Sequence, residues 1–186
     1  KEAEGISSSK DDLRFNSIIP SVSELVKTYC GVSFVDFYSS NKTETFTIDW
    51  DTYVVQLTES PVNSIVSVQE RETYGGSYTP LTTSDSEYYL ESSTDSILRT
   101  NDSGRYQNWP KGVGAVKVVY TGGYSEVPAD LKLAVLDLIT YYYKDEHKQR
   151  QSIAGASLQN QGSSSQRMNV GFPDHIKRVL DLYKNF

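Results

Sequence analysis

The residues of this chain that could take part in catalysis are few and lie far apart in the sequence. There are two histidines, His147 and His175, and a single cysteine, Cys30, among 186 residues. A histidine acts as a general acid or base only beside a partner group, and a cysteine is activated by a nearby base or positive charge. Each histidine is flanked by charged sequence neighbours, which do not face it on a helix. We therefore predict surface positions for both histidines, a small buried hydrophobic role for Cys30, and no enzymatic activity.

Acidic and glycine-rich segments are the remaining candidates for ligand binding. Two groups of side chains could bind a cation: Asp49 with Asp51, and Asp95 with Asn101 and Asp102. Neither has the spacing of a calcium loop, and turn formation explains both. The glycine groups lack the lysine of a phosphate-binding loop, so they predict turns at Gly75-Gly76, Gly112-Val113-Gly114 and Gly122-Gly123. A lone cysteine excludes an internal disulfide and a cysteine-based metal site, and we expect neither a metal nor a cofactor.

The charge and composition bear on possible partners. The net charge is −6, which argues against tight binding to duplex DNA, because phosphate contacts require clustered Lys and Arg. Fourteen tyrosines, against six phenylalanines and two tryptophans, suit either protein interfaces or an exposed β-surface. No stretch approaches the ~20 apolar residues of a membrane span, so no membrane association is expected.

The first part of the chain is predicted to be helical after a flexible tail at residues 1–10. An N-terminal helical region covers residues 11–40. Its main helix is expected to open at Pro20 and Ser21, with Ser21 as N-cap and Glu24 completing a capping box. Gly31 is expected to end this helix.

A β-rich domain is predicted over residues 41–124, because the apolar period changes there from helical to two. Phe46, Ile48 and Trp50 alternate with polar residues, which indicates a strand with one buried face. Further short strands are expected around residues 53–57, 65–68, 78–81, 88–90, 97–98 and 116–120. Their punctuation by Gly, Asn, Asp and Ser is typical of an antiparallel sandwich or small barrel.

Helical periodicity returns in the C-terminal third of the chain. A central helix is predicted within residues 125–150, beginning near Pro128. It is apolar around most of its circumference up to Tyr143, so we expect it to meet its own sheet on one side and a neighbouring subunit on another. The alternative is a central helix of an α+β core that needs no partner. A flexible loop is expected at 151–171 and a last helix at 172–186 that starts at Pro173.

The predicted fold class is α+β: a small bundle of N-terminal, central and C-terminal helices with an inserted antiparallel β-sheet or sandwich domain.

Three sequence features in fixed order resemble the head–tail connector (adaptor, or head-completion) family of tailed bacteriophages. The first is the strand entry at residues 60–68, SPVNSIVSV. The second is the strand and glycine turn at 114–124, GAVKVVYTGGY, which leads into VPADLKLA at 127–134. The third is GFP at 171–173 before a short helix that ends in Leu182-Tyr183.

The resemblance implies a structural subunit of the virion neck, assembled in the host cytoplasm. It implies a homo-oligomeric ring, usually a dodecamer, beneath the portal protein and above a stopper or tail protein. Such a ring joins the head to the tail and extends the channel through which duplex DNA passes without specific binding. No cofactor is implied.

Family members often dock to the portal through their C-terminal segment, so we assign portal contact to residues 144–186. Deletion of residues 174–186 is then expected to abolish attachment to the portal. The residues proposed for subunit or portal interfaces are Leu133, Leu136, Tyr143, Lys148, Arg150, Arg167, Phe172, Ile176, Tyr183 and Phe186.

Two other kinds of protein remain open on the sequence. One is a tail completion or terminator protein of the same kind of particle. The other is a β-rich carbohydrate-binding or adhesion module, whose tyrosines and tryptophans would stack on sugars. That second reading does not explain why the most apolar segment is a helix near the C-terminus.

Overall fold

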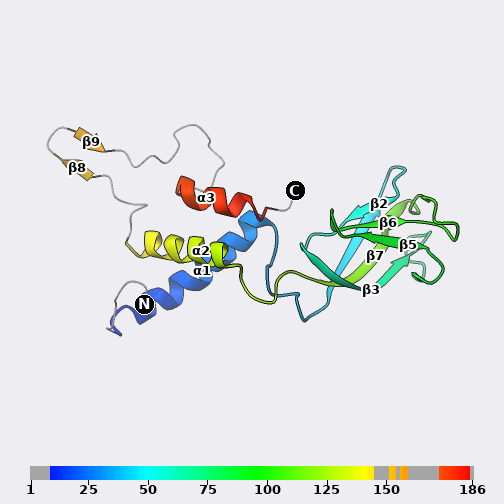
Figure 1. The fold of residues 1–186 in the computed structure, drawn as a ribbon, viewed down its shortest axis with the longest axis horizontal. Helices are drawn as coiled ribbons and strands as arrows, with labels where there is room; N and C mark the ends of the chain where they lie inside the picture. The colour runs from blue at the N-terminus through cyan, green and yellow to red at the C-terminus, as the bar shows by residue number, and fades with distance from the viewer. Residues whose placement is uncertain (1–8, 145–150, 154–155, 159–171, 185–186) are drawn as a thin grey trace. The chain divides into compact units, whose positions relative to one another are not determined.

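The computed structural model describes residues 9–144, 151–153, 156–158 and 172–184. The chain divides into two compact units (Figure 1). Residues 1–31 and 128–184 form one, called here the helical unit, and residues 32–127 form the other, called the β unit. Helices and antiparallel sheets are both present, which confirms the predicted α+β class.

The described residues of the helical unit form three helices and a short hairpin. Helix α1 spans Asp12–Cys30, α2 spans Ala129–Tyr143 and α3 spans Asp174–Asp181. Strands β8 (Gln151–Ile153) and β9 (Ala156–Leu158) pair antiparallel. The sequence predicted a loop throughout 151–171. The hairpin corrects this for its six residues, and the rest of that segment lies outside the described residues.

Helix α1 begins well before the predicted start at Pro20. Pro20 lies inside the helix, where its missing N–H removes one intrahelical hydrogen bond. Ser21, predicted as N-cap, instead donates its hydroxyl to the carbonyl of Ser17 at 2.8 Å, one turn back in the helix. The helix continues through the proline because Phe15, Val22 and later residues bury one face along its whole length. Its C-terminal end is as predicted, with Gly31 in the left-handed conformation and its N–H bonded to the Lys27 carbonyl.

Helices α2 and α3 each begin directly after a proline. Pro128 and Pro173 occupy the N-cap positions, and their carbonyls accept the N–H groups of Lys132 and Lys177. The predicted extension of α2 beyond Lys144 lies outside the described residues. Helix α2 packs against α1 and α3, whereas the sequence predicted its own sheet as the neighbour. An apolar surface does not indicate which element covers it.

The β unit consists of two antiparallel sheets. The first has the order β1-β7-β3-β4 and the second β2-β6-β5. The strands are β1 (Lys42–Ile48), β2 (Val54–Gln56), β3 (Val62–Glu70), β4 (Thr79–Leu81), β5 (Tyr88–Glu91), β6 (Ser96–Arg99) and β7 (Gly112–Gly122). Strand β7 is the longest and pairs with both β1 and β3.

One glycine group differs in role from the predicted turn, and a second glycine makes a close backbone contact. Gly112 and Gly114 lie inside β7 at a bulge, where the register against β1 shifts between Phe46 and Ile48. Gly123 has a φ of 91°, and a Cβ there would lie 2.0 Å from the Phe34 carbonyl oxygen. No residue with a side chain fits that position without moving the backbone.

The core of the β unit lies between its two sheets. Both sheets and the loop before β7 contribute buried side chains: Ile48, Val55, Leu57, Val68, Leu81, Ile97, Trp109, Ala115, Val116, Val118 and Tyr120. Trp50, predicted to share the buried face of β1, lies beyond the end of that strand and is 66% exposed. The predicted strand ran two residues too far, to Trp50, because the bulge and the end of pairing with β7 terminate β1 at Ile48.

Candidate functional site

The residues first considered for chemistry are dispersed through the described part of the chain. Cys30 is buried, as predicted, and His175 is exposed on α3, whereas His147 lies outside the described residues. Asn101 accepts backbone N–H groups from Ser103 and Arg105, as a turn-forming side chain does. The described residues contain no cluster of His, Cys, Asp or Glu suited to a metal ion. Nor do they include a helix long and apolar enough to cross a membrane. The candidate site is the surface of the helical unit, where the predicted interface residues Leu133 and Leu136 have exposed side chains.

Aromatic side chains hold the three helices together. Phe15 of α1 stacks on Tyr143 at the end of α2, with ring centroids 4.5 Å apart. Tyr29 of α1 contacts Phe172 edge to face at 5.0 Å and donates its hydroxyl to Asp181 of α3 at 2.6 Å. Burial, together with this bond and the negative charge of Asp181, raises the pKa of Tyr29 to about 12. These contacts join α1 to the end of α2 through Phe15 and to α3 through Tyr29.

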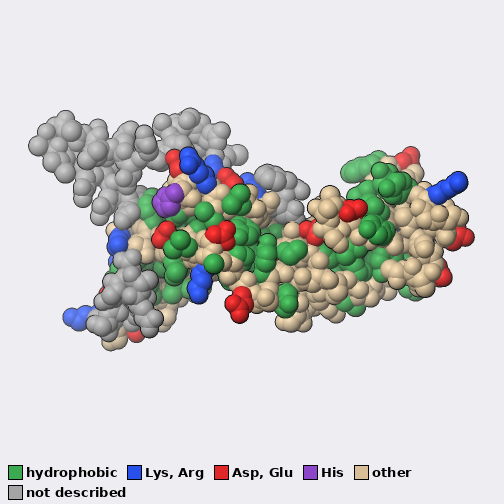
Figure 2. Space-filling model, in the orientation of Figure 1, with side chains coloured by type: hydrophobic (Ala, Val, Ile, Leu, Met, Phe, Trp, Pro, Cys, Tyr) green, Lys and Arg blue, Asp and Glu red, His purple; other side chains and the backbone are tan. Residues whose placement is uncertain are grey.

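Helix α2 carries apolar residues on two opposite sides. Leu131, Ala134 and Leu138 are buried against the other helices. Each residue advances about 100° around a helix, which places Leu133 and Leu136 opposite that buried side. They are 61% and 42% exposed. We call the pair the outer α2 face; hydrophobic side chains also appear on the visible surface of the helical unit in Figure 2.

Charges of opposite sign border the outer α2 face. By the same helical geometry, Lys132 lies on one side of it and Asp130 and Asp137 on the other. All three are exposed. Asp130 also accepts the Tyr183 hydroxyl at 2.6 Å, and this bond lowers the pKa of the Asp130 carboxyl. An exposed apolar strip bordered by charges of both signs is typical of a protein–protein contact surface.

The structure separates the residues predicted for interfaces into three sets. Leu133 and Leu136 are at the surface, side by side on α2. Phe172 and Ile176 are buried inside the helical unit, and Tyr143 and Tyr183 are half-buried there with partners in the same unit. Lys148, Arg150, Arg167 and Phe186 lie outside the described residues.

Some exposed apolar residues of the helical unit were missed by the sequence reasoning. Leu13 and Ile19 of α1 and Leu182 after α3 have largely exposed side chains. Leu13 was overlooked because the main helix was predicted to open at Pro20. A continuous helical pattern through the proline would have identified Leu13 as an outward position, whereas Ile19 falls on the same side of the helix as Phe15 and Val22.

Comparison with known proteins gives a consistent match. The sequence model of the head completion protein family matches residues 1–186. A 72-residue segment is 32% identical to the head completion protein of Escherichia phage T5, covering 38% of this chain and 39% of that protein. The alignment thus spans well under half of the phage protein.

The fold is similar to that of chains in gene transfer agent (GTA) necks. A chain in the neck of an empty GTA particle, computed with C6 symmetry, has a TM-score of 0.59 and 16% identity. That match covers 97% of this chain and 82% of the other. A chain in the native GTA neck, computed with C12 symmetry, has a TM-score of 0.57 and 17% identity over 93% and 82% of the two chains. At these identities the likeness is one of fold.

Proposed function

The chain belongs to the head completion protein family, and from this we propose that it is a structural subunit of a phage neck that joins the head to the tail. The observation that carries the proposal is the family match over residues 1–186. The likeness of fold to chains in GTA necks supports the same location in a particle. The role involves positioning and assembly and no bond-making chemistry.

We propose a ring of identical subunits, and specifically a dodecamer beneath the portal. The support is the cyclic symmetry with which the GTA necks were computed, C6 in one case and C12 in the other. A cyclic ring of more than two subunits requires a heterologous contact between two different patches. The outer α2 face, with its opposite charges on its two borders, suits one side of such a contact.

For the portal contact we propose the C-terminal part of the chain, residues 144–186. Within the described residues, the solvent side of α3 presents His175 and Arg178, with Leu182 just beyond the helix end. The predicted deletion of residues 174–186 would also remove Ile176 and Leu180 from the core of the helical unit. Paired changes Arg178→Glu and Leu182→Glu test the contact without opening that core. Retained binding of this variant to purified portal would argue against the assignment.

The proposed channel for DNA agrees with the charge of the chain. A net charge of −6 suits a channel wall that does not retain passing duplex. We propose a stopper or tail protein as the neighbour below the ring. The alternative, a tail completion or terminator protein, would lie in the tail. Its depletion would then leave defective tails.

A depletion experiment tests the proposed function. Particles assembled without this chain should contain filled heads and separate tails, and adding the purified chain should restore joined particles. Normal joining in its absence would contradict the proposal. Heads that join to defective tails would instead favour the terminator reading. Glycan binding by the purified chain, with no effect on joining, would favour the carbohydrate-binding module.

A further inference from the structure

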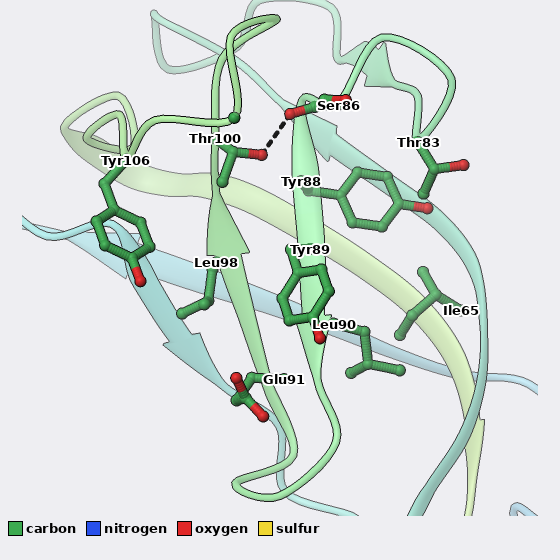
Figure 3. Close-up of a pocket in the computed structure, with 11 residues that line it drawn as sticks. Ile65, Thr83, Ser86, Tyr88, Tyr89, Leu90, Glu91, Leu98, Thr100 and Tyr106 are labelled. Carbon is green, nitrogen blue, oxygen red and sulfur yellow. Dashed lines mark hydrogen bonds between the residues drawn. The ribbon is translucent and has the colours of Figure 1, made fainter.

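A groove of about 700 Å³ runs along one edge of the β unit, apart from the helical surfaces considered above. Strand β5 is the terminal strand of the sheet β2-β6-β5. Residues from both faces of β5 line the groove, together with Ile65 from β3 of the other sheet and Tyr106 from the loop after β6. Figure 3 shows Tyr88, Leu90 and Ile65 on one side of β5 and Leu98 and Tyr106 on the other.

The backbone of β5 has an open edge along this groove. In the ladder between β5 and β6, Tyr89 lies opposite Leu98, and the Thr100 N–H bonds the Glu87 carbonyl at 2.9 Å. Hydrogen-bonding residues alternate along an antiparallel strand, so Glu87, Tyr89 and Glu91 direct their peptide groups toward β6. Tyr88 and Leu90 therefore direct theirs away from β6.

Strand β3 has a matching opening across the groove. Strand β4 pairs with β3 only at Val68, Gln69 and Glu70. Among the described strands, the earlier half of β3, which contains Ile65, is paired only with β7. The groove thus lies between the open edge of β5 in one sheet and the open edge of the earlier half of β3 in the other.

The position of β5 is fixed independently of any partner. Arg99 of β6 forms a two-pronged ion pair with Glu70 of β3, at 3.0 and 2.9 Å, which joins the two sheets. A further guanidinium nitrogen of Arg99 donates to the Glu87 carbonyl at 2.7 Å, directly before β5. The edge is held open in a defined geometry, which lowers the entropic cost of adding a strand.

The side chains around the groove indicate the chemistry of an occupant. Ile65, Tyr88 and Leu90 are half-buried on the side toward the core, so they would receive apolar side chains from alternate positions of a partner strand. On and beside the outer side, Tyr89 and Tyr106 are 56% and 65% exposed. The charged residues next to the lining segments are mostly acidic: Asp85, Glu87, Glu91 and Asp102 against Arg105, with Arg99 paired to Glu70. Carboxylates and exposed tyrosine rings both favour Lys or Arg at the intervening positions.

We propose that this groove binds an extended segment of another protein, which adds as a strand to β5 and has alternating apolar and basic residues. Strand β5 has 4 residues, so a partner segment of about four residues pairs along it. The proposed neck role does not depend on this site, since the surfaces proposed for that role are in the helical unit.

Strand addition can be tested on the full chain with a defined probe. An acetylated hexapeptide of alternating Val and Lys should bind saturably in calorimetry. Amide exchange followed by NMR should slow at Tyr88 and Leu90 on binding and stay unchanged at Tyr89, whose N–H already faces β6. Absence of saturable binding at millimolar peptide, or binding without protection of Tyr88 and Leu90, would overturn the proposal.

Matched changes separate backbone pairing from charge. Methylating the backbone nitrogens of alternate peptide residues removes the donors of a paired strand and should abolish binding without altering the protein. The variant Glu91→Lys should lower the affinity for the Val-Lys peptide about tenfold. The control Glu72→Lys, outside the groove, should leave this affinity unchanged. Equal affinity of a Val-Glu peptide would contradict the basic occupant. Concentration-dependent self-association that the Val-Lys peptide does not displace would show a second copy as occupant and would also overturn the proposal.

Discussion

Glu59 is a charged residue that is only 1% exposed. Its burial is tolerated because both of its carboxylate oxygens accept hydrogen bonds. One accepts the Ser33 N–H at 2.9 Å and the other accepts the Lys42 ammonium at 2.8 Å. Burial opposes the charge on Lys42, but its bonds to Glu59 and Glu44 outweigh this effect and raise the pKa of Lys42. The cluster fastens the segment that enters the β unit to strand β1.

Removing this carboxylate should destabilise the β unit. Glu59→Ala leaves the Ser33 N–H without its partner and leaves Glu44 as the remaining carboxylate bonded to Lys42, so we expect a loss of about 3 kcal/mol in the free energy of unfolding. Urea unfolding of the full chain measures this. The control Glu72→Ala, at an exposed position, should change stability by at most about 0.5 kcal/mol. Equal midpoints for the two variants would show that the cluster is not stabilising.

Cys30 makes the stability of the helical unit depend on pH in the alkaline range. Burial first, and then the negative charge of Asp181, raises the pKa of its thiol from 9.0 to about 11. Between these values the unfolded chain releases a proton that the folded chain keeps. A proton bound more tightly in the folded state means that stability falls as pH rises.

The cysteine variant tests this linkage. In the presence of a reductant, the melting temperature of the helical unit should fall as pH rises from 9 to 10. Tyrosines of an unfolded chain also begin to ionise in this range, so the contribution of Cys30 is the difference between the parent and Cys30→Ala profiles. Cys30→Ala should flatten this part of the profile while lowering the melting temperature at pH 7, because a buried side chain is truncated. An identical slope in the variant and the parent protein would exclude Cys30 as the source.

At the scale of elements, helix α2 has one side that stabilises the chain and one that is available for contact with other chains. Leu138 is fully buried, whereas Leu133 and Leu136 face away from the other helices. An exposed apolar strip contributes little to the folding of a single chain but favours association. Stability and assembly should therefore respond to different residues of the same helix.

Paired substitutions on α2 should separate these two properties. Leu133→Lys and Leu136→Glu together leave the net charge unchanged and place each new charge one turn from an opposite one, Asp137 and Lys132 respectively. We expect less than about 1 kcal/mol change in stability and failure to restore joined particles in the depletion assay. Leu138→Ala should instead cost about 2–5 kcal/mol. Val113→Lys, an exposed apolar position in the β unit, serves as the matched control. Full joining by the paired variant would remove α2 from the proposed interface.

The ends and types of most elements could be predicted because they depend on local chemistry. Gly31, Pro128 and Pro173 mark helix boundaries through their own backbone preferences, and period-two alternation located the strands of the β unit. Pro20 was misread as a helix start because a proline inside a helix is tolerated only when tertiary burial compensates, and burial is not visible in the sequence. Gly112 and Gly114 were read as a turn because a bulge depends on the partner strand.

The candidate site could be predicted only in part for a related reason. Leu133 and Leu136 were predicted as interface residues because a helix that is apolar all round has more hydrophobic surface than one chain covers, and the structure places both at the surface. Phe172 and Ile176 were grouped with them, although the structure buries both inside the helical unit. A single apolar stripe has the same pattern whether it packs inside its own chain or against another.

At the scale of the whole molecule, the β unit is one continuous insertion between two parts of the helical unit. Its entry and exit lie next to each other, since the Tyr124 N–H bonds the Phe34 carbonyl at 2.7 Å. Its core lies between its own two sheets. A continuous segment with its own core and adjacent ends meets the conditions for independent folding.

Expression of residues 32–127 alone tests this independence. The fragment should be monomeric and unfold cooperatively, with the strand content of the β unit retained. It contains Ser33, Lys42 and Glu59, so Glu59→Ala should lower its stability as in the full chain. A fragment that is unfolded at 25 °C would show that the β unit requires the helices.

Averaged images of the portal vertex of particles that contain this chain test the central claim most directly. The account predicts a ring of subunits between head and tail, formed by this chain, with Leu133 and Leu136 of one subunit covered by its neighbour. Mass spectrometry of separated heads and tails should place the chain with the heads. A vertex that lacks the chain, or its presence only in isolated tails, would contradict the proposed role.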